Sequence, residues 1–341
     1  MSSFLKPVVR SAEAAQATVE LGTGPWATAW RKLRVKPAAW SAVAVIVLIT
    51  AAAVCAPLYL SLLSPDTAVF NSNINGTTVI NGEEVDLLQS GVDGSFGVTP
   101  IGPTWDLTNY FLGADAQGRD VMARILFGGA NSLLIGGVAA FLCCLVGGGL
   151  GVIAGFFGGI TDSILSRLFD VLWAFPVYLL AISLSIILVQ NGFSWGPINL
   201  ESDSLMIPTL IIALIYVPYV ARPIRAQTVA IKNRTFVKAS TSLGSSRMRT
   251  LVRDVIPNVL PSLLVYIPIM IALCMLIEAA LSFLGVGVQE PEASWGTIIN
   301  DGLAMMYTRP MVALVPGLLI AATAAAFNIL GDALRDSLEA N

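Results

Sequence analysis

The chain has 341 residues, of which 55% are hydrophobic and only 12% are charged. Soluble domains carry about 25% charged residues, so this composition excludes an ordinary soluble protein. The apolar stretches are long and continuous, whereas the strands of a membrane β-barrel are alternating segments of about 10 residues. We therefore expect an all-α integral membrane protein.

The N-terminal region divides into a polar tail and a first membrane anchor. Residues 1–25 are rich in Ala, Ser and Thr and show no periodicity, which predicts a disordered cytoplasmic tail. Residues 26–36, WATAWRKLRVK, join aromatic and basic side chains, as an interfacial helix does, although an ordinary basic flank has the same composition. The apolar run that follows is too long for a cleaved signal peptide. Residues 26–62 are therefore predicted to hold an interfacial helix and the first span.

Six apolar stretches approach or exceed the roughly 20 residues that a membrane-spanning helix requires. They are 40–62, 129–157, 168–190, 206–221, 258–284 and 311–331. The fourth is short and has prolines in or beside it, which spans tolerate when neighbouring groups satisfy the freed backbone. The sequence predicts six transmembrane helices.

A polar segment of about 50 residues, 63–112, separates the first two spans. Its β-branched residues are broken by N-G, N-G and D-G, which predicts short strands and tight turns. We expect a small β-rich external insert. Its acidic residues indicate either a solvated outer face or a contact with an external partner; they are Asp66, Glu83, Glu84, Asp86, Asp93 and Asp106.

Lys and Arg are distributed very unevenly between the two sides of this topology. With the N-terminus inside, the inner segments hold 16 of them, and the outer segments hold only Arg119, Arg124 and Arg309. The positive-inside rule then places both termini, including the tail 336–341, in the cytoplasm. Residues 190–205 and 286–310 become outer loops, and Pro291, Trp295 and Gly296 predict that the second of these is packed or re-entrant.

The second span contains GGGLGVIAGFFGG, in which Gly147, Gly151, Gly155 and Gly159 recur every four residues. On a helix this spacing aligns the four glycines on one face, where another backbone can approach closely. The pattern predicts helix packing rather than ligand chemistry. The cysteines also fall inside spans and are interpreted as packing residues; they are Cys55, Cys143, Cys144 and Cys274.

The chain lacks residues that several kinds of catalysis and nucleotide binding require. There is no His and no G-x-x-x-x-G-K-[ST] motif, so a Ser-His-Asp enzyme is excluded, no metal site is predicted, and any ATP must bind on another chain. Glu278 is the only carboxylate well inside a span. We therefore name Glu278, Ser282 and Phe283 as candidates for a pathway or gate. A proton-coupled carrier needs ionisable groups along its path, and a single carboxylate makes that mechanism a weak candidate.

A small basic segment, TFVKASTSLGSSRMRT (235–250), lies in the predicted cytoplasmic loop 222–255 between the fourth and fifth spans. Thr235 can cap a short helix, Phe236, Ala239 and Leu243 form an apolar stripe, and Gly244 can stop it in a left-handed conformation. So short a helix is marginal alone. It either docks into a groove on a partner or lies on the membrane surface, drawn there by its Lys and Arg.

Motifs spread along the chain resemble those of the permease subunits of bacterial ABC importers, in particular the C-type membrane subunit of the oligopeptide/dipeptide and nickel uptake group. The stretches that carry this resemblance are WRKLRV with APL (56–58), LGADAQGRDVMARILFGG (112–129), GFFGGITDSILSRLFDVLWAFP (155–176), IPNVLPSLLV (256–265), EAALSFLGVGVQEPEASWG (278–296) and AFNILGDALRDSLE (326–339). The resemblance covers about 28–60 and 109–340 and leaves out the insert.

The resemblance implies a type I ABC importer permease fold, with the transmembrane core at 113–335. It implies a coupling helix that carries an E-A-A-x-x-x-G motif and docks on an ATPase subunit. Aligned by Gly244, the motif positions are Lys238, Ala239 and Ser240, so a Lys stands where the family has an acid. The implied coupling residues are Phe236, Val237, Lys238, Ala239, Ser240, Leu243 and Gly244.

The resemblance also implies a complex in the bacterial inner membrane. Its members would be this chain, a second homologous permease, two ATPase subunits that bind ATP and Mg, and an extracytoplasmic substrate-binding protein, with lipid around the spans and no nucleic acid. This chain would be no enzyme but half of a pathway for oligopeptides or dipeptides, working by alternating access. Glutathione-like peptides and nickel chelates remain open as solutes. The rival classes are a secondary carrier or channel that acts alone and a scaffold or sensor subunit without transport.

Overall fold

The computed structural model describes residues 25–63, 77–80, 82–86, 101–195 and 198–339. Residues 1–24 of the predicted disordered tail (1–25), the acidic residues Asp66 and Asp93, and two long stretches of the insert lie outside the described residues.

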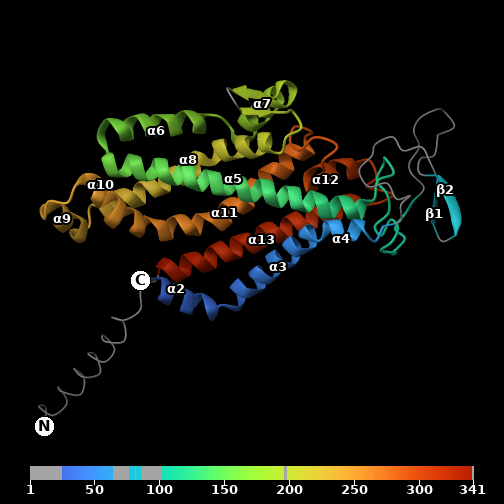
Figure 1. Ribbon diagram of the computed structural model, residues 1–341, viewed down its shortest axis with the longest axis horizontal. Helices are drawn as coiled ribbons and strands as arrows, with labels where there is room; N and C mark the ends of the chain where they lie inside the picture. Colours follow the sequence, from blue (N-terminus) through green and yellow to red (C-terminus); the bar gives the residue numbers. More distant parts are fainter. Residues whose placement is uncertain (1–24, 64–76, 81, 87–100, 196–197, 340–341) are drawn as a thin grey trace, which may run out of the picture.

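Long helices lie side by side along the longest axis of the molecule, and a small hairpin lies beyond one end (Figure 1). The long helices are α3 (Pro37–Val54), α5 (Val121–Phe157), α6 (Gly159–Ala174), α8 (Met206–Lys232), α11 (Ile256–Phe283) and α13 (Met311–Glu339). Five described helices are long and apolar enough to cross a membrane, or up to six spans if one bent pair counts as a span. The membrane-protein class and the helical bundle are confirmed.

The two ends of the bundle differ. One end carries the short helix α9 (Thr235–Ser242), together with α2 (Pro25–Arg34) and the C-terminal part of α13; we call it the α9 end. The other carries α12 (Trp295–Leu303) and the hairpin, and we call it the α12 end.

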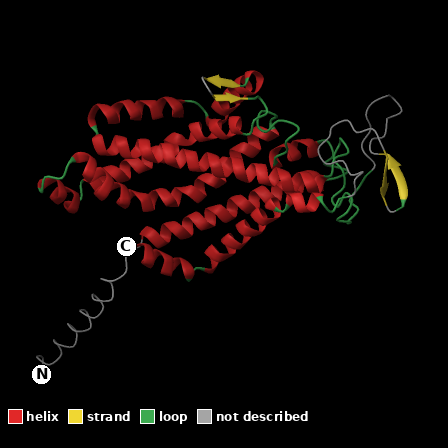
Figure 2. Cartoon of the chain, viewed as in Figure 1, coloured by secondary structure: helices red, strands yellow, loops and turns green. Residues whose placement is uncertain are grey.

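The predicted third span, 168–190, was wrong as a single helix. It is divided between α6 and α7 (Val177–Asn191), whose axes meet at 86°. Pro176 has no N–H to continue the helix and drives the residue before it out of the helical region. Phe175 is accordingly extended, with φ −92° and ψ 139°. Beyond α7 lies a second hairpin that was not predicted, β3 (Phe193–Trp195) paired with β4 (Ile198–Leu200) (Figure 2).

The predicted fourth span, 206–221, was too short. α8 continues to Lys232 and keeps Pro218 and Pro223 inside it. Proline is tolerated there because packing against neighbouring helices supports the interrupted backbone. α8 therefore reaches the α9 end as one continuous helix.

α5 supplies the face on which α8 rests, and three of the four predicted glycines form it. A Cβ at Gly147, Gly151 or Gly155 would lie 2.7, 2.5 or 2.7 Å from a carbonyl oxygen of α8. Only Gly lets the two backbones approach this closely. Gly159 is an exception, because it is the first residue of α6 rather than part of α5; its φ is +57°, and a Cβ there would meet nothing within 4 Å.

The insert contains the predicted β structure. β1 (Thr77–Ile80) pairs antiparallel with β2 (Glu83–Asp86), and Gly82 turns between them with φ +86°. The hairpin is attached to the chain before α5, because the Asn109 amide donates to the carbonyl of Val79 at 3.0 Å.

The N-terminal segment packs along the outside of the bundle. α2 is a helix, as the first of the two interpretations predicted, and it contacts α13. Lys36 reaches Asp336 of α13 at 2.9 Å. α3 follows from Pro37, and the short helix α4 (Ala56–Leu60) extends it towards the α12 end.

Replacing Gly151 with Ala should destabilise the bundle, because the new methyl group would meet the carbonyl of Ala221 at 2.5 Å. Overpacking of this kind costs about 1–3 kcal/mol. Gly149 is the matched control, since a Cβ there meets nothing within 4 Å. Thermal unfolding in detergent should show a lower midpoint for G151A and an unchanged or raised midpoint for G149A, and equal midpoints would contradict the close contact.

Candidate functional site

α9 connects α8 to the helices that enter the fifth span, and it projects at the end of the bundle (Figure 1). The helix begins at Thr235, with Arg234 as its N-cap, and no side chain caps it. The prediction that Thr235 caps the helix was therefore wrong, because Thr235 is already inside the first turn.

The predicted stop at Gly244 is confirmed. Gly244 has φ +87°, a conformation that costs glycine little. Its N–H donates to the carbonyl of Thr241 at 3.1 Å, and the N–H of Ser245 donates to the carbonyl of Ser240 at 3.2 Å. This pair of bonds is the Schellman arrangement, which satisfies carbonyls that the helix end leaves open.

α9 exposes one apolar stripe and buries one residue. Phe236 is 42% exposed, Leu243 is 90% exposed, and Ala239 lies between them on the exposed side. Val237 is only 2% exposed and belongs to the main hydrophobic core. Burying a Val side chain is worth roughly 1.5–3 kcal/mol, so Val237 anchors α9 to its own chain and is not available to a partner.

A second attachment fixes the orientation of α9. The Ser240 hydroxyl donates to the carboxylate of Asp254 at 2.7 Å. Asp254 lies in a π-helical turn, Leu251–Val255, which leads into α11. Ser240 thus connects α9 directly to the start of the fifth span, and the stripe is left facing outward.

A cavity of about 350 Å³ lies beside Lys238. Phe156 and Phe157 at the end of α5 form one wall, and Lys232, Lys238 and Arg247 bring three cations to it. The Lys232 ammonium donates to the carbonyl of Phe156 at 2.6 Å. No Asp or Glu is among the described residues that line this cavity, so it favours an anionic group.

The predicted pathway residues lie inside the chain. Glu278 and Ser282 are 0% and 1% exposed, and Phe283 is half-buried. The Ser282 hydroxyl donates to Glu278 at 2.7 Å and accepts from the N–H of Val288 at 3.0 Å. These bonds attach the loop after α11 to its last turn. Neither residue lines a described cavity, so their visible contribution is to position this loop.

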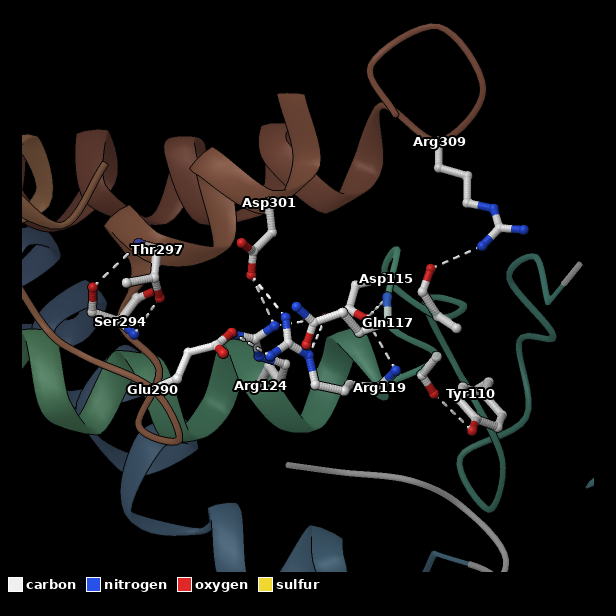
Figure 3. Close-up of polar contacts among 12 residues, drawn as sticks. Tyr110, Asp115, Gln117, Arg119, Arg124, Glu290, Ser294, Thr297, Asp301 and Arg309 are labelled. Atoms are coloured by element: carbon white, nitrogen blue, oxygen red, sulfur yellow. Dashed lines mark hydrogen bonds and ion pairs between the residues drawn. The ribbon is translucent and has the colours of Figure 1, made fainter. Parts of the chain in front are cut away.

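The α12 end is held by a buried network of charges (Figure 3). Arg119 contacts Asp115 at 2.6 Å, Glu290 at 2.8 Å and Asp301 at 3.0 Å. Arg124 contacts Asp115 at 2.6 Å and Asp301 at 2.9 Å. The side chains of Asp115, Arg119 and Arg124 are each only 2% exposed. Each buried arginine contacts more than one carboxylate, and this attraction offsets the free-energy cost of removing the charges from water.

This network joins segments that are far apart in the sequence. Asp115 and Arg119 lie in the loop before α5, and Arg124 lies in the first turn of α5. Asp301 lies on α12, and Glu290 lies in the loop between α11 and α12. α12 is also wedged in place by Trp295, whose indole N–H donates to the carbonyl of Ile125 at 3.0 Å. The prediction that the segment 286–310 is packed is thus confirmed.

The cap of α5 belongs to the same region. The carboxylate of Asp120 accepts from the N–H of Ala123 at 2.7 Å. Burial raises the pKa of Asp120 to about 6. This cap is therefore near half-protonation in slightly acidic conditions, unlike an exposed aspartate.

Sequence reasoning counted Arg119 and Arg124 only as outer charges. A signal was present, because the two arginines lie five residues apart in LGADAQGRDVMAR, next to Asp115 and Asp120. The partners Glu290 and Asp301 lie more than 160 residues away along the chain. Such a pairing cannot be read from one sequence.

Replacing Arg119 with Gln should lower the stability strongly, because it leaves buried Asp115 with one cation fewer. Removing one partner of a buried pair costs about 3–5 kcal/mol. Glu290 is the control, since its side chain is 54% exposed and an exposed pair contributes about 1 kcal/mol or less. In thermal unfolding, the midpoint of R119Q should lie well below that of E290Q. Equal decreases in the midpoint would contradict the buried network.

Comparisons with known proteins agree with this arrangement. Residues 147–341 match the family "Binding-protein-dependent transport system inner membrane component". Residues 24–72 match "N-terminal TM domain of oligopeptide transport permease C". The fold resembles the structure described as "Inward facing conformations of the MetNI methionine ABC transporter", with a TM-score of 0.52 at 18% identity, covering 63% of this chain and 97% of that one.

Curated relatives align with about two thirds of the chain. An oligopeptide transport system permease protein, OppC, of Haemophilus influenzae is 36% identical over 67% of this chain and 70% of its own length. OppC of Bacillus subtilis is 37% identical over 68% and 72%. A glutathione transport system permease protein, GsiD, of Pectobacterium atrosepticum is 35% identical over 67% and 72%. The chain therefore belongs to the inner membrane components of binding-protein-dependent transport systems, the permeases of ABC importers.

Proposed function

We propose that this permease forms half of the pathway of an ATP-driven importer in a bacterial inner membrane and that its solutes are oligopeptides or dipeptides. Its partners are a second homologous permease, two ATPase subunits that bind ATP and Mg, and an extracytoplasmic binding protein. The observation that carries the proposal is α9, an anchored helix whose apolar stripe faces outward at one end of the bundle. The relatives named for oligopeptide and glutathione transport support a peptide as solute.

The charges support an orientation with the α9 end in the cytoplasm. Lys and Arg gather there, as the positive-inside rule requires of the inner side. The cations at the α12 end have protein partners: Arg119 and Arg124 contact carboxylates, and Arg309 donates to the carbonyl of Ala114 at 2.9 Å. Both termini then lie inside, because α2 and the end of α13 lie at the α9 end.

α9 suits transmission of movement, because it is fixed to its own chain at two points and exposes the rest. Val237 and Ser240 attach it to the core and to the turn before α11. A force on Phe236 or Leu243 therefore moves α8 and α11 together. ATP shifts the equilibrium between two states of the ATPase pair only by binding one state better than the other. Contact with α9 would couple that shift to a movement of the spans.

The cavity beside Lys238 supports an acidic group on the partner ATPase. Lys238 replaces the acid that the family motif carries at this position, and Lys232 and Arg247 add two more cations. An acidic side chain that enters this space would be attracted by all three.

The carrier or channel that acts alone is the second candidate, and reconstitution separates it from the proposal. The purified single chain in liposomes should take up no peptide, whereas the assembled complex with ATP should. Uptake by the single chain would favour the rival.

Replacing Leu243 with Asp should uncouple ATP hydrolysis from uptake. The change puts a charge on the most exposed position of the stripe, where the partner would have to desolvate it. Peptide uptake should fall at least tenfold while the permease still inserts in the membrane. Leu107 is the control, because it is 52% exposed at the α12 end, and L107D should keep its uptake. Uptake at the wild-type rate in L243D would remove the coupling assignment.

Replacing Lys238 with Glu should weaken assembly with the native ATPase by reversing a charge in the cavity. The loss should shrink as salt screens the interaction. Pull-down yield across a range of salt concentrations measures this. R249E is the control, since Arg249 is exposed and does not line the cavity. An unchanged yield for K238E at every salt concentration would argue against an acidic partner.

A further inference from the structure

α6 has two exposed sides of different character. Together with α7 it is apolar enough to count as one membrane span. Ile160, Ile164, Leu168 and Val171 recur along α6 at intervals of three or four residues, and all four are exposed. This spacing places them on one side of the helix, and a continuous apolar stripe of this kind suits contact with lipid. The polar residues on another side of α6 therefore need a different neighbour.

That other side carries a connected group of charged and aromatic side chains. Asp170 of α6 forms an ion pair with Arg222 of α8 at 2.6 Å. The guanidinium of Arg222 also lies over the ring of Trp173, 4.0 Å from its centroid. The rings of Trp173 and Tyr219 meet edge-on, with their centroids 6.1 Å apart. We call these four residues, Asp170, Trp173, Tyr219 and Arg222, the α6–α8 cluster.

The α6–α8 cluster is exposed and leaves one acceptor open. The side chain of Asp170 is 68% exposed, and Trp173 and Tyr219 are 46% and 43% exposed. Arg222 contacts the Oδ1 oxygen of Asp170, and no described residue donates to Oδ2. An exposed carboxylate oxygen beside aromatic rings favours an organic ammonium group, because the carboxylate attracts its charge and the rings stabilise a cation.

Lipid is an unfavourable neighbour for the α6–α8 cluster. Ionisable groups within membrane spans face a bundle interior or a water-filled cavity, because a charge in hydrocarbon is costly. A protein partner would have to supply a cation, since covering Asp170 without one buries an unpaired carboxylate oxygen. A water-filled pathway avoids both costs and lets a passing solute supply the cation.

We propose that the α6–α8 cluster lines the solute pathway and that Asp170 binds an ammonium group of the transported solute, such as the N-terminus of a peptide. The inference rests on the proposed transport function and adds a solute chemistry to it. Arg222 holds the carboxylate through Oδ1 and leaves Oδ2 for the ammonium group, while Trp173 and Tyr219 provide aromatic surface beside it. An exposed ion pair is weak, so the solute can leave again.

Labelling of a cysteine beside Asp170 tests the preference for ammonium without transport. Ala174 is exposed one turn after Asp170. A174C in a Cys55→Ser background offers one accessible thiol, because the three remaining cysteines are buried. The probes are a methanethiosulfonate that carries a trimethylammonium group and its neutral hydroxyethyl counterpart. Both react with the same thiolate, so a change in the thiol pKa cancels in the ratio of the two rates.

In the assembled complex, D170N should lower the ratio of the cationic to the neutral rate about fivefold, the effect of one charge a few ångströms away in water. D170E should keep the ratio. D162N is the matched control, because Asp162 also joins α6 to α8 but has both of its oxygens bound by Arg225. An unchanged ratio in D170N, or an equal fall in D162N, would overturn the proposal.

The same labelling separates the pathway from the other possible neighbours of the cluster. Both probes should label A174C with ATP or without it. Labelling by the neutral probe alone would place the cluster in lipid, which the cationic probe does not enter. Labelling by neither probe in either nucleotide state would mean that a protein partner covers the cluster. Each of these two results would overturn the proposal.

Uptake connects the α6–α8 cluster to transport. Uptake of a peptide with a free N-terminal ammonium group should fall about fivefold in D170N, in line with the loss of one charge, and should recover in D170E. No uptake by the wild-type complex would contradict the proposed function. Uptake at the wild-type rate in D170N would contradict the ammonium site and leave the transport function standing.

Discussion

The close contact between α5 and α8 determines where the rest of the α9 end lies. Three glycines on α5 let carbonyl groups of α8 approach within 2.5 to 2.7 Å of the position that a Cβ would occupy. In a membrane, packing of this kind is a main source of helix association, because lipid is as apolar as the side chains. α8 is therefore held along α5 past its two internal prolines, and α9 begins three residues after α8 ends.

The two ends of the bundle use opposite solutions for charge. At the α12 end, buried arginines contact carboxylates from three separate segments, which fixes α12 against α5 and leaves little freedom. At the α9 end, Lys232, Lys238 and Arg247 line a cavity that has no acidic group among its described lining residues. Paired charges suit the rigid α12 end, and a positively charged cavity at the α9 end suits contact with an anionic group of a partner.

The sequence predicted those features that depend on local pattern. The membrane class, the glycine face, the hairpin of the insert and the stop at Gly244 each follow from residue types at fixed spacing. The errors came where a proline or a tertiary contact decided. Pro176 broke the predicted third span, whereas Pro218 and Pro223 did not end α8, because α5 supports it. The network around Arg119 and the cavity beside Lys238 depend on contacts between distant segments, and one sequence gives no measure of these.

Photocrosslinking from Leu243 tests the central claim most directly. A photoreactive residue at position 243 should crosslink to an ATPase subunit in the assembled complex, because the apolar stripe of α9 is the proposed contact. The same residue at Leu107, exposed at the opposite end, should yield no ATPase adduct. An ATPase crosslink from position 107 with none from position 243 would contradict both the orientation and the role of α9.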